Sequence, residues 1–164
     1  MAAHYTISPL NEENAREITT WSYLPPFNLY DPTPEHFSCF LDPDYRYHQV
    51  LDQKGNLVGF CCFGLDAQVP GGSYQLTETR VLDIGVGLWS DLVGQGLGLN
   101  FVSAVLDYAA KKYQPACFRV TIAYFNQRSQ NTFLKLGFKV SHFLFVNWQK
   151  CLSHNLKRKS YESC

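Results

Sequence analysis

Val81–Lys112 reads VLDIGVGLWSDLVGQGLGLNFVSAVLDYAAKK and predicts a strand, a glycine-spaced loop and a long helix, in that order. Residues 97–112 are apolar except for one narrow polar stripe, so we expect this helix to be mostly buried against a sheet. Gly94, Gly96 and Gly98 alternate through the loop where the helix should begin. Glycines allow a tight turn with uncovered N–H groups, and the first helical turn also has unpaired N–H groups at the positive end of the helix dipole. The loop therefore predicts a site for a phosphate or diphosphate, and a glycine-rich turn without a ligand is the alternative.

Two well-known phosphate loops do not fit this pattern. The dinucleotide fingerprint G-x-G-x-x-G needs a third glycine where Leu99 stands, and a P-loop needs Gly-Lys-Ser/Thr where the chain has Gly98, Leu99 and Asn100. The remaining pattern resembles the acetyl-coenzyme A loop of the GNAT superfamily of N-acetyltransferases, Q/R-x-x-G-x-G/A. Gly96 and Gly98 match it, whereas Val93 replaces the usual Gln or Arg. This change removes one polar side-chain contact but leaves the main-chain amides in place.

A second segment also resembles GNAT proteins, in which N-x-x-A-x-x-x-Y-x-K-x-G-F follows the next strand. The matching residues here are Asn126, Lys135, Gly137 and Phe138. Ser129 stands for the alanine, and Phe133 stands for the tyrosine. Since the two motifs occur in the family's order within roughly residues 47–145, the chain is identified as a member of the superfamily. The resemblance implies an α/β fold of the α+β type, with a mixed, mainly antiparallel twisted sheet, helices on both faces and a parallel pair of splayed strands.

The remaining segments predict one domain over residues 1–150 and a frayed tail over residues 151–164. A helix follows the cap Asn11, an aromatic loop with a double proline covers Trp21–Tyr30, and a short helix begins at Thr33. The strand after the central helix should lie parallel to the strand before it, because the helix acts as a crossover. The expected strands are 5–7, 45–51, 57–66, 74–88, 117–125 and 138–146.

Composition and charge exclude several classes of function. The chain has 164 residues, of which 46% are hydrophobic, and this suits one globular domain. Its formal net charge is zero, so it lacks the basic surface of a non-specific nucleic-acid binder. The sequence shows no signal pattern and no apolar run long enough to cross a bilayer, and we expect a cytoplasmic protein with neither nucleic-acid nor membrane partners. The six cysteines and five histidines show no metal-ligand spacing, so we expect no metal and reduced thiols.

The resemblance implies direct transfer of an acetyl group from acetyl-coenzyme A to a primary amine in a ternary complex. The pantetheine arm would lie between Ile84–Leu88 and Val120–Tyr124, where Gly85 and Gly87 fit a bulge or a close backbone approach. The alternative is that these glycines only relieve packing. The Leu88 main-chain N–H would polarise the thioester carbonyl. The residues expected to bind the cofactor are Val86, Leu88, Val93, Gly94, Gln95, Gly96, Leu97, Gly98, Asn126, Arg128 and Phe133. Asn126 could equally be only a helix cap, and Arg128 only a solvated charge.

Catalysis needs a group that removes a proton from the amine, because an ammonium has no lone pair with which to attack. A carboxylate or an ordered water can take this proton. Asp83 is the first candidate because it is a charge in an apolar strand, although pairing with Arg80 or capping a main-chain group is an equal alternative. Glu78 is the second candidate. Tyr124 could protonate the leaving thiolate in place of the tyrosine that Phe133 replaces.

The aromatic loop predicts either an acceptor site or a plug at the edge of the domain. If it binds the acceptor, the residues concerned are Trp21, Tyr23, Phe27 and Tyr30. We expect a small-molecule or protein amine as acceptor, and a monomer or homodimer. A catalytically inactive module that binds coenzyme A or acyl-coenzyme A is the alternative function, because Val93 and Phe133 depart from the family pattern. A structural or interaction domain whose glycine turn binds nothing is a further alternative.

Overall fold

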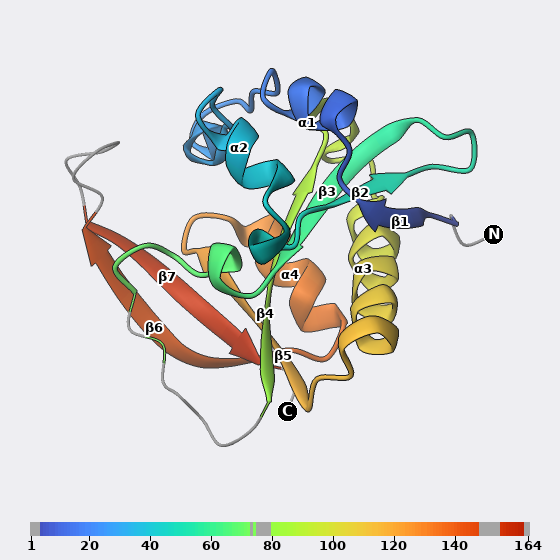
Figure 1. Ribbon diagram of the computed structural model, residues 1–164. Coiled ribbons are helices and arrows are strands. Elements are labelled where there is room, and N and C mark those ends of the chain that lie inside the picture. Colours follow the sequence, from blue (N-terminus) through green and yellow to red (C-terminus); the bar gives the residue numbers. More distant parts are fainter. Residues whose placement is uncertain (1–3, 73, 75–79, 148–154, 163–164) are drawn as a thin grey trace.

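Seven strands of the described residues form one sheet, in the order β1-β2-β3-β4-β5-β7-β6 (Figure 1). The structure is a computed structural model of the chain that describes residues 4–72, 74, 80–147 and 155–162. All neighbouring strands pair antiparallel except β4 and β5, which are parallel. The strands are β1 Thr6–Pro9, β2 His48–Leu51, β3 Leu57–Phe63, β4 Val81–Leu88, β5 Cys117–Ala123, β6 Lys139–Asn147 and β7 Asn155–Glu162.

Helices cover both faces of this sheet. The long helix α3 carries the chain from β4 to β5 and so makes this pair parallel. Helices α3 and α4 pack on one face, whereas α1 and α2 pack on the other (Figure 1). The helices are α1 Glu12–Ile18, α2 His36–Leu41, α3 Gly98–Tyr113 and α4 Gln127–Lys135. The mixed sheet, the crossover and the helices on both faces confirm the predicted fold class.

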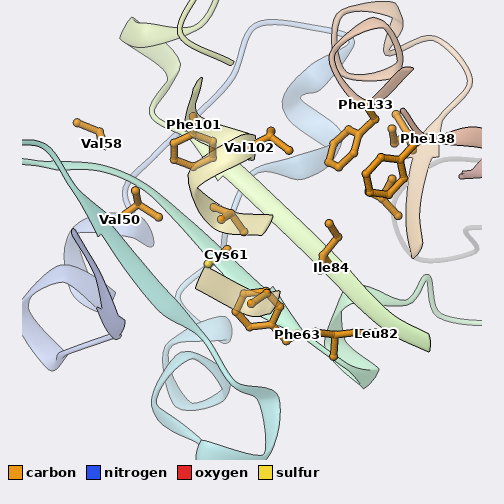
Figure 2. Packing of buried hydrophobic residues seen from close by; sticks show 14 residues of the cluster. Val50, Val58, Cys61, Phe63, Leu82, Ile84, Phe101, Val102, Phe133 and Phe138 are labelled. Atoms are coloured by element: carbon orange, nitrogen blue, oxygen red, sulfur yellow. The ribbon is translucent and has the colours of Figure 1, made fainter. Parts of the chain in front are cut away.

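The larger hydrophobic core lies between the sheet and α3. Side chains alternate along a strand, and Leu82 and Ile84 of β4 therefore point to the same face, where they join Phe101 of α3 in one cluster (Figure 2). Phe133 of α4 meets Phe138 edge to face in the same core, with ring centroids 5.0 Å apart. This packing holds the first turn of α3 beside the carboxyl end of β4, where the glycine loop joins them.

The glycines inside β4 make room for side chains of β3. The register of β3 on β4 runs without a shift from Gly59 opposite Leu88 to Phe63 opposite Ile84, so the bulge considered at Gly85 and Gly87 does not occur in this pair. A Cβ on Gly85 would lie 2.8 Å from the Cys62 Sγ, and one on Gly87 would lie 2.4 Å from the Phe60 ring. Both glycines therefore relieve packing against side chains of β3, which is the alternative to a bulge or a close approach of backbone.

The end of the chain differs from the frayed tail that the sequence predicted. Asn155–Glu162 form β7, which lies between β5 and β6 and pairs antiparallel with both. The pattern NLKRKSYE has no alternation of apolar and polar residues, so hydrophobic periodicity could not reveal it. The thiols also differ in part from the expectation, because Cys117 is disulfide-bonded, whereas Cys39, Cys61 and Cys62 are free. No helix among the described residues combines the length and apolar character that crossing a bilayer requires.

Candidate active site

A gap opens between β4 and β5 toward their carboxyl ends. The two strands pair in parallel register only as far as Asp83 and Arg119. Beyond this point β4 continues to Leu88 and β5 continues to Ala123 without pairing to each other. This geometry confirms the splayed strand pair that the sequence predicted.

Main-chain groups of Val86 and Leu88 point into this gap. The Trp89 N–H, directly after β4, donates to the Val58 carbonyl at 2.9 Å. Trp89 and every second residue before it, Gly87 and Gly85, therefore direct their main-chain groups toward β3. In an antiparallel pair, such residues alternate with residues whose N–H and C=O groups point the other way. Leu88 and Val86 belong to this second set, given the register of the two strands. Their N–H groups are therefore directed toward the side on which β5 has moved away.

The glycine loop leads from the end of β4 into α3 with its amides unpaired. Gly94 and Gly96 have φ of 83° and 77°, values that favour glycine. The loop is largely exposed, and within the described part of the chain no acceptor lies on the main-chain N–H of residues 94–98. The Gln95 side chain donates to the Asp91 carbonyl at 2.6 Å, and this hydrogen bond stabilises the conformation of the loop. These free amides at a helix N-terminus form a cradle for an anion.

A positive charge stands next to this cradle. Asn126 caps α4 by accepting from the Ser129 N–H at 3.2 Å, and Arg128 lies in the first turn of that helix. The Arg128 guanidinium carbon sits 4.5 Å above the Phe27 ring, which restricts its position. A Cβ placed on Gly94 would be 3.7 Å from the Arg128 Nη1. Arg128 is therefore near enough to the glycine loop to contact an anion bound there.

The aromatic loop is attached to both splayed strands. The Tyr23 hydroxyl donates to the Leu88 carbonyl at 2.9 Å, and the Tyr30 hydroxyl accepts from the Ala123 N–H at 3.3 Å. Burial, and after it the charge of Asp31, raise the pKa of Tyr23 to about 12, so this phenol stays protonated near neutral pH. Trp21 is buried against the Phe60 ring instead. The loop thus covers the ends of β4 and β5, and all of its aromatic residues except Trp21 are partly exposed there.

The family of the chain follows from a match over most of its length. A family model described as "Acetyltransferase (GNAT) domain" matches residues 5–139, which include β4, the glycine loop and α4. The chain belongs to the GNAT acetyltransferase family. Both motifs that carry the sequence resemblance lie inside the matched residues. Curated protein sequences gave no significant match.

Solved structures of low identity share the fold of this GNAT domain. A GNAT-family acetyltransferase from Bacillus anthracis has a TM-score of 0.73 at 15% identity, with 99% of this chain and 95% of that chain covered. A chimeric spermidine N-acetyltransferase from Vibrio cholerae has a TM-score of 0.71 at 14% identity, with 96% and 93% covered. Mutant forms of the spermidine/spermine N-acetyltransferase from Vibrio cholerae give 0.68 at 15% identity, with 97% and 93% covered. At these identities the similarity establishes the architecture only.

Asp83 of the GNAT domain is fully engaged in a buried ion pair. Its two carboxylate oxygens accept from the Arg119 Nε at 2.5 Å and Nη2 at 2.7 Å, and Gln68 adds a hydrogen bond at 2.8 Å. The partner is thus Arg119 of β5 rather than the neighbouring Arg80. Asp83 also lies five residues before Leu88, roughly 16 Å along a strand. Both facts weigh against the base role that the sequence suggested. The other candidate, Glu78, lies outside the described residues.

The two aromatic candidates on the cofactor side lie in different environments. Phe133 has no exposed surface, so its ring is part of the core and does not reach the loop surface as a ligand contact would require. Tyr124 follows β5 directly, and half of its surface is exposed. Its main-chain carbonyl accepts from the Gln130 side chain at 2.8 Å, which fixes the turn between β5 and α4. Tyr124 therefore lies at the mouth of the gap.

One carboxylate that the sequence did not single out is linked to Leu88 through Tyr23. The Asp31 Oδ1 accepts from the main-chain N–H of Tyr23 at 2.8 Å, and the hydroxyl at the other end of Tyr23 donates to the Leu88 carbonyl. Its position in a Tyr-Asp-Pro turn carries no motif, and only the folding of the aromatic loop brings it to the gap. Among the described residues no group of three or more His, Cys, Asp or Glu side chains could hold a metal ion.

Proposed function

We propose that this GNAT protein is an N-acetyltransferase that moves the acetyl group of acetyl-coenzyme A directly to a primary amine in a ternary complex. The observation that carries the proposal is the run of unpaired amides at residues 94–98, which opens into α3 beside the gap of β4 and β5. A diphosphate fits such a cradle, and an extended thioester-bearing arm fits a gap lined by unpaired strand amides.

The residues around the gap support a division of roles. The amides of residues 94–98 would hold the diphosphate, with Arg128 as the adjacent cation. Val86 would hydrogen-bond the pantetheine arm, and the Leu88 N–H would polarise the thioester carbonyl, where negative charge develops. Acetyl-coenzyme A supplies the activated acetyl group and a thiol leaving group. Because an ordinary thiol has a pKa of about 8.5, the leaving thiolate needs little assistance, and we assign its protonation to Tyr124.

The acceptor would approach from the side of the aromatic loop. Tyr23, Phe27 and Tyr30 lie at the ends of the splayed strands and present partly exposed rings there. Engineered forms of a spermidine N-acetyltransferase from Vibrio cholerae have the same fold, which supports an amine as the acceptor class. The loop also carries Asp31, a counter-charge for an ammonium group.

A thiol-release assay tests this function. The protein is mixed with acetyl-coenzyme A and a panel of amines, and free coenzyme A is followed with a thiol reagent. We expect release that depends on the acceptor and a matching acetylated amine by mass spectrometry. A rise of the thermal midpoint with coenzyme A, without turnover of any amine, would instead support the alternative of an inactive binding module. Phe133 and Val93 favour that alternative, since neither supplies the polar group usual in the family. No rise and no turnover would contradict both.

A further inference from the structure

Asp31 is tied to the residue that contacts the end of β4. Its Oδ1 accepts from the Tyr23 N–H at 2.8 Å, and the hydroxyl of the same tyrosine donates to the Leu88 carbonyl at 2.9 Å. In the described part of the chain no donor is within hydrogen-bonding distance of the second oxygen, Oδ2. The adjacent Tyr30 hydroxyl accepts from the Ala123 N–H of β5 at 3.3 Å. Asp31 is therefore a half-buried carboxylate with one oxygen free. It lies between two tyrosines, of which Tyr23 binds β4 and Tyr30 binds β5.

The other carboxylates of the region are less suited to meet an amine at Leu88. Asp83 is saturated by Arg119 and Gln68 at the closed end of the gap. Glu17 and Asp52 line a cavity of about 490 Å³ together with Val58 and Trp89, and the Trp89 N–H is directed to Val58 of β3 rather than into the gap. The charge of Asp31, by contrast, contributes to the raised pKa of Tyr23, so it acts on the phenol that touches Leu88.

We propose that Asp31 binds the ammonium form of the acceptor and takes its first proton, directly or through one water. This proposal rests on the acetyltransferase function and deepens it: the acceptor is a primary alkylamine that is charged near neutral pH. A proton passes from the ammonium to Asp31 and on to solvent, and the free nitrogen pair forms the C–N bond as the C–S bond breaks. The nitrogen then loses a second proton, and the thiolate gains one.

Asp31→Asn removes the charge while the amide oxygen still accepts from the Tyr23 N–H. The variant is assayed with two acceptors, a primary alkylamine and an aromatic primary amine that is already neutral at the assay pH. We expect kcat/KM for the alkylamine to fall by roughly 100-fold or more, because a general base contributes at least that much. The aromatic amine should lose far less, since it offers no ammonium to bind and no first proton to remove. Asp31→Glu should recover part of the loss.

Asp44→Asn is the matched control, because Asp44 is an exposed carboxylate before β2. It should leave both acceptors unaffected. Equal losses on the two acceptors in Asp31→Asn, or no loss on either, would overturn the proposal. If Asp31→Asn melts well below the wild type, the two acceptors are compared in Asp31→Glu instead. This variant keeps the negative charge, so it should retain the wild-type ratio of kcat/KM for the alkylamine to kcat/KM for the aromatic amine more closely than Asp31→Asn does. A ratio as low as that of Asp31→Asn would overturn the proposal.

Calorimetric binding of the alkylamine in the presence of coenzyme A separates this proposal from the function itself. Weaker binding to Asp31→Asn than to the wild type supports an ammonium site at Asp31 even if no amine is turned over. A wild type without turnover would then contradict the acetyltransferase function alone. Unchanged binding together with unchanged turnover in Asp31→Asn would contradict the role of Asp31 and leave the function standing.

Discussion

Asp83 and Arg119 form a buried ion pair at the point where β4 and β5 separate. Both side chains are less than a tenth exposed, and the contact is bidentate. Such a pair links β4 to β5 at the closed end of the gap, because its two hydrogen bonds join neighbouring strands where their parallel pairing ends. The physical role we assign to Asp83 is therefore positional.

Replacing Asp83 tests that role. We expect Asp83→Asn to lower the free energy of unfolding by about 3–5 kcal/mol, because it removes the carboxylate that the buried Arg119 guanidinium contacts with two nitrogens. Denaturant unfolding measures the change, with Asp44→Asn expected to stay within about 0.5 kcal/mol of the wild type. The double variant Asp83→Leu/Arg119→Met should be more stable than Asp83→Asn, because it removes the buried guanidinium together with the carboxylate. A loss below about 1 kcal/mol in Asp83→Asn would show that the pair does not hold the strands.

His48 gives the stability a dependence on pH. It is 3% exposed, its Nδ1 donates to the Arg46 carbonyl at 2.8 Å, and its Nε2 faces the Lys112 ammonium at 3.3 Å. Phe63 and Tyr108 pack on the ring. Burial, and after it the charge of Lys112, lower the pKa of His48 below its usual value, so the folded state disfavours the protonated imidazole.

The sign of this effect follows from proton linkage. Below the ordinary histidine pKa of about 6.5 the unfolded chain binds a proton that the folded state resists, so the free energy of unfolding decreases as the pH falls from about 6.5 toward the folded pKa. Thermal melts between about pH 8 and pH 5 should show a declining midpoint in the wild type and a flatter curve in His48→Gln. Curves of equal slope would exclude His48 as the titrating group.

The glycine loop depends on backbone conformations that favour glycine. Gly96 has φ of 77°, and no atom lies within 4 Å of the place that a Cβ would take, so a side chain there costs backbone strain and causes no clash. Gly55, in the turn between β2 and β3, has φ of 84° and equally open surroundings. The two glycines therefore form a matched pair with the same strain at different places.

We expect Gly96→Ala and Gly55→Ala each to lose about 1–2 kcal/mol of stability, the usual cost of a left-handed conformation for an L-residue. Only Gly96→Ala should also weaken coenzyme A binding, by roughly tenfold if a similar energy is lost from the cradle. Calorimetric titration with coenzyme A measures this difference. Equal affinities in the two variants would mean that the diphosphate is bound elsewhere.

The whole sheet depends on a strand from the end of the chain. β7 is the antiparallel partner of both β5 and β6, and Ser160 lies opposite Thr121 on one side and His142 on the other. Without β7, β5 would lose its only neighbour other than β4, and β6 would be left without a partner in the described sheet. The part of the sheet next to α4 and Arg128 is therefore completed by β7, which joins β5 to β6.

Ser160→Pro tests this dependence, because proline cannot donate to the ladder of a central strand. We expect a loss of stability at the upper end of the usual range, about 3 kcal/mol, measured by denaturant unfolding. Ser160→Thr is the control, since threonine suits a strand, and it should stay near the wild type. If the two variants unfold alike, β7 does not have a central position in the sheet.

Local features of the fold were predictable because their causes are local. Glycines at positive φ, an asparagine before a helix and a buried amphipathic helix each depend on residues within a few positions. Three predictions depended on local causes of this kind: the loop from Gly94 to Gly98, the helix cap at Asn126 and the crossover between β4 and β5. The strand at 155–162 was missed because its pairing uses main-chain groups, which every residue possesses and which leave no mark in the side-chain pattern.

The sequence by itself determined that a strand, a glycine loop and a buried helix follow one another in this GNAT domain, since backbone preferences and periodicity act over short distances. Only the tertiary structure decided that Asp83 pairs with Arg119, 36 residues away, that Phe133 is enclosed in the core, and that Tyr23 connects Asp31 to the end of β4. The physical reason is that a charge takes its role from the groups packed around it, and those groups come from segments whose meeting no local pattern encodes.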